Sequence, residues 1–287
     1  MIDLSPDECI ARIEQEHPFE ARVNDGAFEV RIRDYAAHVC TAIHAGHRMR
    51  DELLSKCALS ESERLYEEDP LTDTLVANQP VTVFARDSRF EYDLNRAPEA
   101  CIYEEAWGKA VWKQPLTETE RRTSLDKHAA FYAVLGALYR KLESLHPAVL
   151  TYDVHSYNWQ RPGMGDTPVF NVGTEQIDMA RWEGAVNQWV AELSRIRLPD
   201  IPIRAAINEV FFGRGYHATF VRENLPNTLI LPSEVKKIFM DENTGTPLPD
   251  ILASLHQQFE DAITRHASTF VETCKQEPGN ENRCPEP

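Results

Sequence analysis

Short apolar segments that end in polar or charged residues recur along the chain. Segments of this kind are typical of buried strands that present functional groups at their ends. They are HVCTAI (38–43), VTVFA (81–85), AVLTYDV (148–154), IRAAI (203–207) and TLIL (228–231). The pattern predicts a buried sheet that contains these strands.

Three segments with helical spacing of apolar residues lie among the strands, at residues 124–146, about 177–196 and about 250–274. Ser124 stands where a capping residue for the first helix is expected. Because parallel neighbours need long crossover connections, helices of this length favour a mostly parallel sheet. The sequence therefore predicts an α/β fold with three α/β/α layers and a mostly parallel central sheet.

The length of the chain suits one such domain. It has 287 residues, of which 42% are hydrophobic, so it can bury a sizeable core. Residues 1–275 are expected to form a single α/β domain. The polar, proline-containing segment 276–287 is expected to be a flexible C-terminal tail.

The net charge argues against two classes of partner. The chain carries 30 basic and 46 acidic residues, a formal net charge of −16. A chain this acidic repels nucleic acid and anionic lipid. Its N-terminal segment lacks the features of a secretory signal, and no apolar run is long enough to span a membrane. We therefore expect a soluble, cytoplasmic protein that binds neither nucleic acid nor membranes.

Two histidines follow predicted strands. His44 comes directly after the first strand, with Gly46 expected to allow a tight turn and His47 three residues on, while Asp153 and His155 end the third strand. Histidines at the carboxyl ends of parallel strands point into the crevice where α/β proteins bind ligands. A lone histidine there is more often a surface residue, and Asp153 could orient a core histidine. The same Asp–His pairing also fixes the tautomer of a metal-bound imidazole.

An acidic segment, YEEDPLTDTL (66–75), lies between the two histidines. An acidic run is usually a solvated face, and this interpretation holds for most of its carboxylates. Two imidazoles and one carboxylate, however, form the ligand set of a hydrolytic zinc site with an open position for water. The segment therefore contains candidates for a third ligand: Glu67, Glu68, Asp69 and Asp73.

A further carboxylate, Glu234, follows the apolar strand in LILPSEVKKIF. A carboxylate beside a metal can take a proton from water and act as a general base. Alternatively, Glu234 forms an ion pair with Lys236 or Lys237. The spacing alone does not decide between the two.

The segment RDSRFEYDLNR (86–96) is rich in groups that recognise carboxylates. Arg89 and Arg96 are suited to bind an anionic substrate bidentately, with Asp93 and Asn95 bracing them. The alternative is a surface strand with alternating charges.

Taken in order, these segments resemble the N-formylglutamate amidohydrolase family. That family has a histidine-glycine turn, an acidic segment, a serine-arginine stretch ending in DLNR, a strand with D-hydrophobic-HS, and an apolar strand ending in glutamate. The matching segments, with DLNR and DVHS the most specific, are HAGHRMRDEL (44–53), EEDPLTDTL (67–75), DSRFEYDLNR (87–96), DVHSY (153–157) and LPSEVKKIFMDE (231–242).

The resemblance implies a fold and a cofactor. The family is similar to the zinc exopeptidase-like hydrolases, which have a phosphorylase/hydrolase-like sheet. It implies one divalent metal ion, zinc (Zn²⁺), held by His44, Asp69 and His155, with Glu67 as the alternative third ligand. Glu234 then takes the role of general base and later donates a proton to the leaving amine.

The resemblance also implies a substrate, a small anionic N-formyl or N-acyl amino acid such as N-formylglutamate, or a peptide terminus. Arg89 acts in catalysis or substrate binding, and further binding residues are Asn95, Arg96, Asn208 and Arg214.

Two departures from the family pattern leave the substrate open. The start reads IHAGH (43–47) in place of proline-histidine-serine-glycine, and the helix before DVHSY has Phe131-Tyr132-Ala133 in place of a tyrosine-histidine pair, with His128 one turn earlier. Two alternatives therefore stand beside the amidohydrolase: a carboxypeptidase-like enzyme acting on peptide tails, and an inactive protein that binds acyl amino acids.

Overall fold

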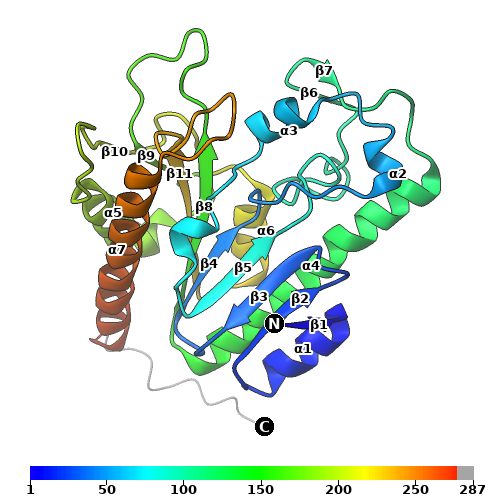
Figure 1. Ribbon diagram of the computed structural model, residues 1–287. Coiled ribbons are helices and arrows are strands. Elements are labelled where there is room, and N and C mark those ends of the chain that lie inside the picture. The colour runs from blue at the N-terminus through cyan, green and yellow to red at the C-terminus, as the bar shows by residue number, and fades with distance from the viewer. Residues whose placement is uncertain (277–287) are drawn as a thin grey trace.

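The computed structural model describes residues 1–276, and within this part nine strands form one mixed sheet (Figure 1). The strand order is β1-β2-β3-β5-β4-β8-β11-β9-β10. The bounds are β1 Ile2–Leu4, β2 Phe19–Val23, β3 Phe28–Ile32, β4 His38–Ala42, β5 Val81–Ala85, β8 Val149–Tyr157, β9 Phe170–Val172, β10 Ala205–Ile207 and β11 Thr228–Lys236.

The centre of the sheet is parallel. Strands β5, β4, β8 and β11 pair side by side in parallel, whereas β2–β3, β3–β5 and β11–β9 are antiparallel. All nine residues of β8 are buried, as expected for a strand covered on both faces. The predicted mostly parallel α/β sheet is confirmed, and the five predicted strands correspond to β4, β5, β8, β10 and β11.

Four strands of this sheet were not predicted: β1, β2, β3 and β9. In β2 and β3 buried side chains alternate with charged or partly exposed ones, the pattern of strands with one solvated face. Because apolar and polar residues alternate along these two strands, neither strand contains a continuous apolar run. The short β9 carries the polar Asn171 at its centre.

Helices cover both faces of the sheet (Figure 1). Buried apolar residues of α1 (Pro6–Glu14), α4 (Glu118–Leu145) and α6 (Tyr216–Asn224) belong to one hydrophobic cluster. Those of α5 (Met179–Ser194) and α7 (Pro249–Gln276) belong to a second cluster, which includes Trp189 and Phe259. The three-layer arrangement therefore has a separate core on each side of the sheet.

The first predicted helix begins earlier than expected, so the prediction of Ser124 as its cap is wrong. The N-cap of α4 is Thr117, which forms a capping box with Glu120. Ser124 lies buried within the helix and accepts a hydrogen bond from Arg50 at 2.8 Å. The first turns of α4 are highly polar, so the apolar spacing begins well after the helix does. The other two helices lie close to their predicted bounds.

Short elements connect the strands near the carboxyl ends of β4 and β5 (Figure 1). They are α2 (Asp51–Leu54), α3 (Glu61–Glu67) and the hairpin of β6 (Glu105–Ala106) and β7 (Lys109–Ala110). A 3₁₀ turn at Thr74–Val76 precedes β5 and lies against α7. No helix within residues 1–276 combines the length and apolar character needed to cross a membrane. The division into a domain 1–275 and a tail 276–287 stays a prediction: Gln276 ends α7, and 277–287 lie outside the described residues.

Candidate metal centre and its pocket

The carboxyl ends of neighbouring strands bring the candidate groups together. His44 follows β4, and His155 and Glu234 lie on β8 and β11 as directly opposed partners in the parallel register. Asp69 arrives from the segment after α3, and its backbone N–H donates to the carbonyl of His44 at 3.0 Å. The parallel topology thus places at one edge three side chains that are far apart in sequence.

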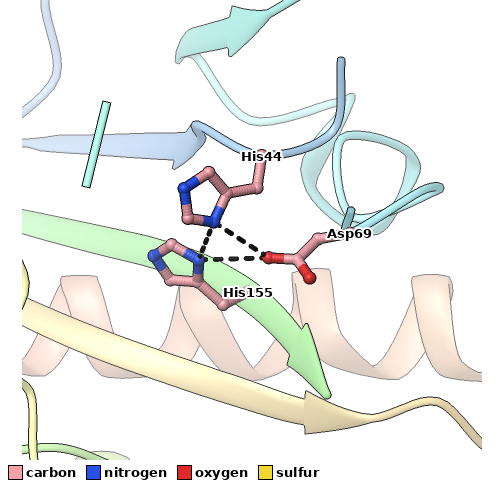
Figure 2. Close-up of side chains that lie close together, drawn as sticks. All are labelled: His44, Asp69 and His155. Carbon is pink, nitrogen blue, oxygen red and sulfur yellow. Dashed lines mark hydrogen bonds and ion pairs between the residues drawn. The ribbon is translucent and has the colours of Figure 1, made fainter. Parts of the chain in front are cut away.

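His44, Asp69 and His155 converge on one point (Figure 2). The two Nδ1 atoms lie 3.2 Å apart, and the Asp69 Oδ2 atom lies 3.2 Å from His155 Nδ1 and 3.3 Å from His44 Nδ1. All three side chains are buried. Within the described residues they are the group of histidine, cysteine and carboxylate side chains whose donor atoms are spaced to hold a metal ion.

Carboxylates behind the two histidines set their tautomers. The Nε2 atom of His44 lies 2.7 Å from Asp93 Oδ1, and that of His155 lies 3.0 Å from Asp153 Oδ2. Each Nε2 therefore carries a hydrogen, which leaves a lone pair on each Nδ1. The predicted pairing of Asp153 with His155 is present, and Asp93 does the same for His44.

This donor set fits a divalent cation. Two imidazole lone pairs and a carboxylate face one another without a hydrogen between them, an arrangement that a shared cation stabilises. A tetrahedral site with metal–nitrogen bonds of about 2.0–2.1 Å spaces its ligand atoms roughly 3.3 Å apart. Burial favours protonated Asp69, but His155 and His44 hold its pKa below the ordinary value. Asp69 is therefore a carboxylate ready to bind a cation.

Glu234 has no ionic partner among residues 1–276. Its carboxylate makes no hydrogen bond or ion pair with any residue in the range 1–276. Lys236 instead donates to the carbonyl of Thr167 at 3.0 Å, and Lys237 donates to the carbonyls of Tyr66 and Glu68 at 2.8 and 2.7 Å. The alternative in which Glu234 pairs with a neighbouring lysine is therefore wrong.

The electrostatics of Glu234 suit proton transfer. In the chain without metal, burial raises the pKa of this carboxyl to about 8; His155 in its protonated form opposes the rise, and the charges of Asp69 and Asp153 reinforce it. A group that titrates this close to neutral pH both accepts and releases a proton readily.

The raised pKa predicts how stability changes with pH once metal is removed by a chelator. The ordinary pKa of the glutamate carboxyl is 4.5 and the folded value is about 8. Between these values the folded chain holds the extra proton, so stability falls as pH rises through this window. Glu234→Gln has no such loss. The variant's gain in melting temperature over the wild type is expected to grow between pH 5 and pH 8, and an unchanged difference would refute the raised pKa.

The predicted anion-binding residues Arg89, Asn95 and Arg96 all line the pocket above this cluster. Arg89 is nearly buried, pairs with Asp93 at 2.7 Å and lies over the Trp107 ring, with its guanidinium carbon 5.1 Å from the centroid. Arg96 is exposed and donates to the Asn95 carbonyl at 3.0 Å, and it makes no ion pair within the described chain.

The other two predicted binding residues differ in placement. Arg214 lines the pocket and forms an ion pair with Glu175 at 2.5 Å. Asn208 does not line it, because its side chain is held by Thr174 through hydrogen bonds of 2.7 and 2.9 Å. Asn208 therefore shapes the segment that follows β10 and lies outside the pocket wall.

Glu67 and His47 both lie away from the cation site. Glu67, the alternative third ligand, lines the pocket but forms an ion pair with Arg161. His47 is hydrogen-bonded to Glu68 and does not line the pocket. The structure thus separates Asp69 from its acidic neighbour and His44 from its neighbouring histidine.

Two supporting residues were missed or only partly understood from the sequence. Asp93 braces Arg89 as expected, but it also holds His44 and accepts a hydrogen bond from Tyr103. His217, fully buried on α6, places its Nδ1 atom 3.1 Å from Asp153. The DLNR motif offered a signal for Asp93. His217 follows no apolar strand, so the pattern gave no reason to select it.

Gly46 has a different role from the predicted tight turn. A Cβ atom at this position would lie 2.4 Å from the carbonyl carbon of Arg86 and from the carbonyl oxygen of Asp87. The chain after β4 therefore passes directly against the chain after β5, which carries the arginine-rich segment.

This close approach predicts that Gly46→Ala lowers the free energy of unfolding by about 1–3 kcal/mol or more, since the backbone must move. Denaturant titration measures the loss. Gly184→Ala is the matched control, because a Cβ on that exposed helical glycine of α5 meets nothing within 4 Å. It should be neutral or stabilising. Equal effects of the two changes would contradict the packing argument.

The cluster lies in a cavity of about 980 Å³. Its wall includes the three candidate ligands, Glu234 and the arginines described above. The cavity therefore joins a cation site, an unpaired carboxylate and cationic side chains in one space.

Comparisons with known proteins agree with this site. The family model for N-formylglutamate amidohydrolase matches residues 36–230. The fold resembles N-formylglutamate amidohydrolase from Ralstonia eutropha JMP134, with a TM-score of 0.71, 17% identity, and coverage of 86% of this chain and 98% of that one. It also resembles a protein of Agrobacterium tumefaciens, with a TM-score of 0.62, 17% identity, and coverage of 88% and 97%.

These two structures, at such low identity, show a shared fold. No curated protein gave a significant match. The family model covers more than half of the chain and includes His44, Asp69, the DLNR segment and His155. The chain belongs to the N-formylglutamate amidohydrolase family.

Proposed function

We propose that this protein is a metal-dependent amidohydrolase that cleaves N-formyl or N-acyl amino acids related to N-formylglutamate. His44, Asp69 and His155 are the proposed ligands of one divalent ion, with zinc our first choice. The observation that carries the proposal is the convergence of two imidazole lone pairs and one carboxylate within 3.3 Å of one another. Family membership supports the amide as the bond that is cleaved.

The metal and Glu234 have different proposed roles in hydrolysis. When bound, the metal polarises the amide oxygen and lowers the pKa of water. Glu234 takes the proton of the attacking water as the new C–O bond forms. It then delivers this proton to the amine nitrogen as the C–N bond breaks, and a carboxylate and a free amine result. Glu234 lies directly opposite His155 in the strand pairing and makes no ion pair within residues 1–276, so its carboxylate is placed for both steps.

The arginines have separate proposed roles. Arg89 is fixed by Asp93, which also holds His44, so its charge is placed beside the cation site, where negative charge develops on the amide oxygen. Arg96 is exposed in the same cavity and has no acidic partner in the part of the chain that the structure covers. It is the proposed binding partner of the substrate carboxylate.

Arg96→Ala is therefore expected to raise KM and to lower kcat/KM on a confirmed substrate by about 10-fold or more, the scale of one charge-assisted hydrogen bond. Arg89→Ala is expected to lower kcat as well. Steady-state kinetics separate the two effects. Arg122→Ala is the control, since this exposed α4 residue lies outside the cavity wall and forms an ion pair with Asp126 across one turn. Unaltered kinetics in Arg96→Ala would remove this residue from the binding site.

Elemental analysis of the purified protein, followed by a screen of N-acyl amino acids and dipeptides with product detection, tests the function itself. Release of a free amino acid from N-acyl amino acids with about one metal ion per chain is the expected result. Cleavage of dipeptides alone would favour a peptidase, and binding without turnover would favour a binding protein.

A further inference from the structure

Three exposed aromatic side chains gather in the wall of the catalytic cavity. Within residues 1–276, the exposed phenylalanine and tryptophan side chains are Trp107, Phe211 and Phe212, at 43%, 39% and 38% of full exposure. All three line the cavity that contains the cation site. Single exposed apolar residues are common, but exposed aromatic rings confined to one cavity mark a surface that meets an apolar group.

Trp107 occupies a backbone position that disfavours it. Trp107 and Gly108 connect β6 and β7 as a two-residue turn, and their φ angles are +50° and +74°. Turns with positive φ at both positions favour asparagine followed by glycine, and a bulky residue at the first is strained. The Trp107 ring packs against Phe90, Tyr103 and Arg89, yet Trp107 is still 43% exposed. Such strain is typical of positions kept for function.

Phe211 and Phe212 lie on a segment whose backbone is firmly held. The buried Asn171 side chain donates to the Phe211 carbonyl at 2.7 Å and accepts hydrogen bonds from the N–H groups of Glu209 and Val210, both at 2.9 Å. Gly173 and Gly213 pass so closely that a Cβ on Gly173 would lie 2.2 Å from the Gly213 nitrogen. The two rings are therefore displayed by a rigid support.

This support is joined to the catalytic strands. Asn171 on β9 pairs directly with Glu234 on β11, and the Phe211 ring contacts that of Tyr157, two residues after His155, at 5.5 Å between centroids. The aromatic side chains are thus placed relative to the proposed base and ligand through strand pairing.

The size of the cavity also indicates that it holds an apolar group. Its volume of about 980 Å³ lies at the upper end of the range for sites that bind drug-sized ligands. An N-formyl amino acid fills only a small part of it. The remaining space has aromatic side chains on two walls, which come from the β6–β7 hairpin and from the segment after β10.

We infer that the substrate, if the proposed hydrolase function holds, is an N-acyl amino acid with a large apolar group, either in its acyl chain or in its side chain. Trp107, Phe211 and Phe212, here named the aromatic rim, contact this apolar group. Arg96 binds its carboxylate, since the other arginines of the cavity wall are paired with Asp93, Glu67 and Glu175. The enzyme thereby selects substrates larger than N-formylglutamate.

Two matched substrate series test this inference. One series lengthens the acyl chain of N-acyl-L-glutamate from formyl to octanoyl, and the other enlarges the side chain of N-acetyl amino acids from alanine to leucine and phenylalanine. We expect kcat/KM to rise at least about 10-fold with apolar size in one of them, because even one methylene in an apolar pocket is worth that much. Values that stay flat or fall in both series overturn the inference.

Variants assign the preference to the aromatic rim. The double change Phe211→Ala and Phe212→Ala should reduce the ratio of kcat/KM between the largest and smallest substrate by about 10-fold. Leu145→Ala is the control, because Leu145 is similarly exposed, at 39%, but lies at the end of α4 and outside the cavity wall. An unchanged ratio in the double variant overturns the role of these rings.

Trp107→Asn separates a role of Trp107 in substrate binding from a role in stabilising the turn. Asparagine suits the turn, so the melting temperature should rise or hold, while the preference for large substrates falls. A variant that keeps the full preference excludes Trp107 from the aromatic rim.

Amine analogues, in which a methylene replaces the acyl carbonyl, separate this inference from the function it rests on. They cannot be hydrolysed, so calorimetry measures binding alone. Tighter binding with apolar size, without hydrolysis of any amide, supports the apolar site and refutes the hydrolase. Hydrolysis that ignores apolar size, with equal binding of all analogues, refutes the apolar site and leaves the hydrolase intact.

Discussion

Glu234→Gln is expected to keep its metal and to lose kcat on the order of 10²-fold or more, because an amide cannot accept the proton of water. The side chain keeps its size, and no hydrogen bond or ion pair within residues 1–276 is lost with the charge. The three ligand atoms stay in place, so metal content should match that of the wild type. Elemental analysis and steady-state kinetics on one preparation give both values.

Glu183→Gln is the matched control, since Glu183 is exposed on α5 and lies outside the cavity wall. It should match the wild type in both measurements. Loss of metal together with activity in Glu234→Gln would show that Glu234 is itself a ligand. Full activity with full metal content would exclude it as the base.

His155→Ala and His44→Ala are each expected to abolish stoichiometric metal binding and, with it, hydrolysis. Removal of either imidazole leaves two of three donors, and the buried carboxylate that held its Nε2 atom loses one of its partners. His155→Ala should have the larger effect on stability, because Asp93 keeps its ion pair with Arg89, whereas buried Asp153 is left with His217 and the Thr41 hydroxyl.

His47→Ala tests whether these losses are specific. His47 is three residues from His44 but is bound to Glu68 and lies outside the cavity wall. This variant should retain its metal and its activity. Full metal content in His44→Ala or His155→Ala would refute the ligand assignment.

Much of the central sheet follows from local pattern. The parallel strands β4, β5, β8 and β11 are buried on both faces, so their sequences are continuously apolar and visible without other information. Because such strands share an edge at their carboxyl ends, His44, His155 and Glu234 could be placed near one another before the structure was known. Strands with one solvated face, such as β2, carry a weaker signal.

The choice among neighbouring acidic residues could not be made from sequence. Glu67 and Asp69 stand two residues apart with similar chemistry, and their separation depends on contacts from distant segments. Arg161 takes Glu67, while the main chain of His44 fixes that of Asp69. For the same reason, the sequence could not show that Asp93 contacts both His44 and Arg89, because these residues come together only in the folded chain.

The contacts of Lys237 couple the cation site to the folding of the sheet. Lys237 comes directly after β11, and its buried ammonium group donates to the carbonyls of Tyr66 and Glu68, in the segment that leads into Asp69, so the third donor is in place only when β11 has joined the sheet. His155 is 111 residues from His44 and 86 from Asp69 along the chain. An unfolded chain cannot assemble such a set, so a cation that binds it stabilises only the native state, by an amount that grows with the logarithm of its free concentration. The lifetime of the folded protein in a cell then depends on the supply of that ion.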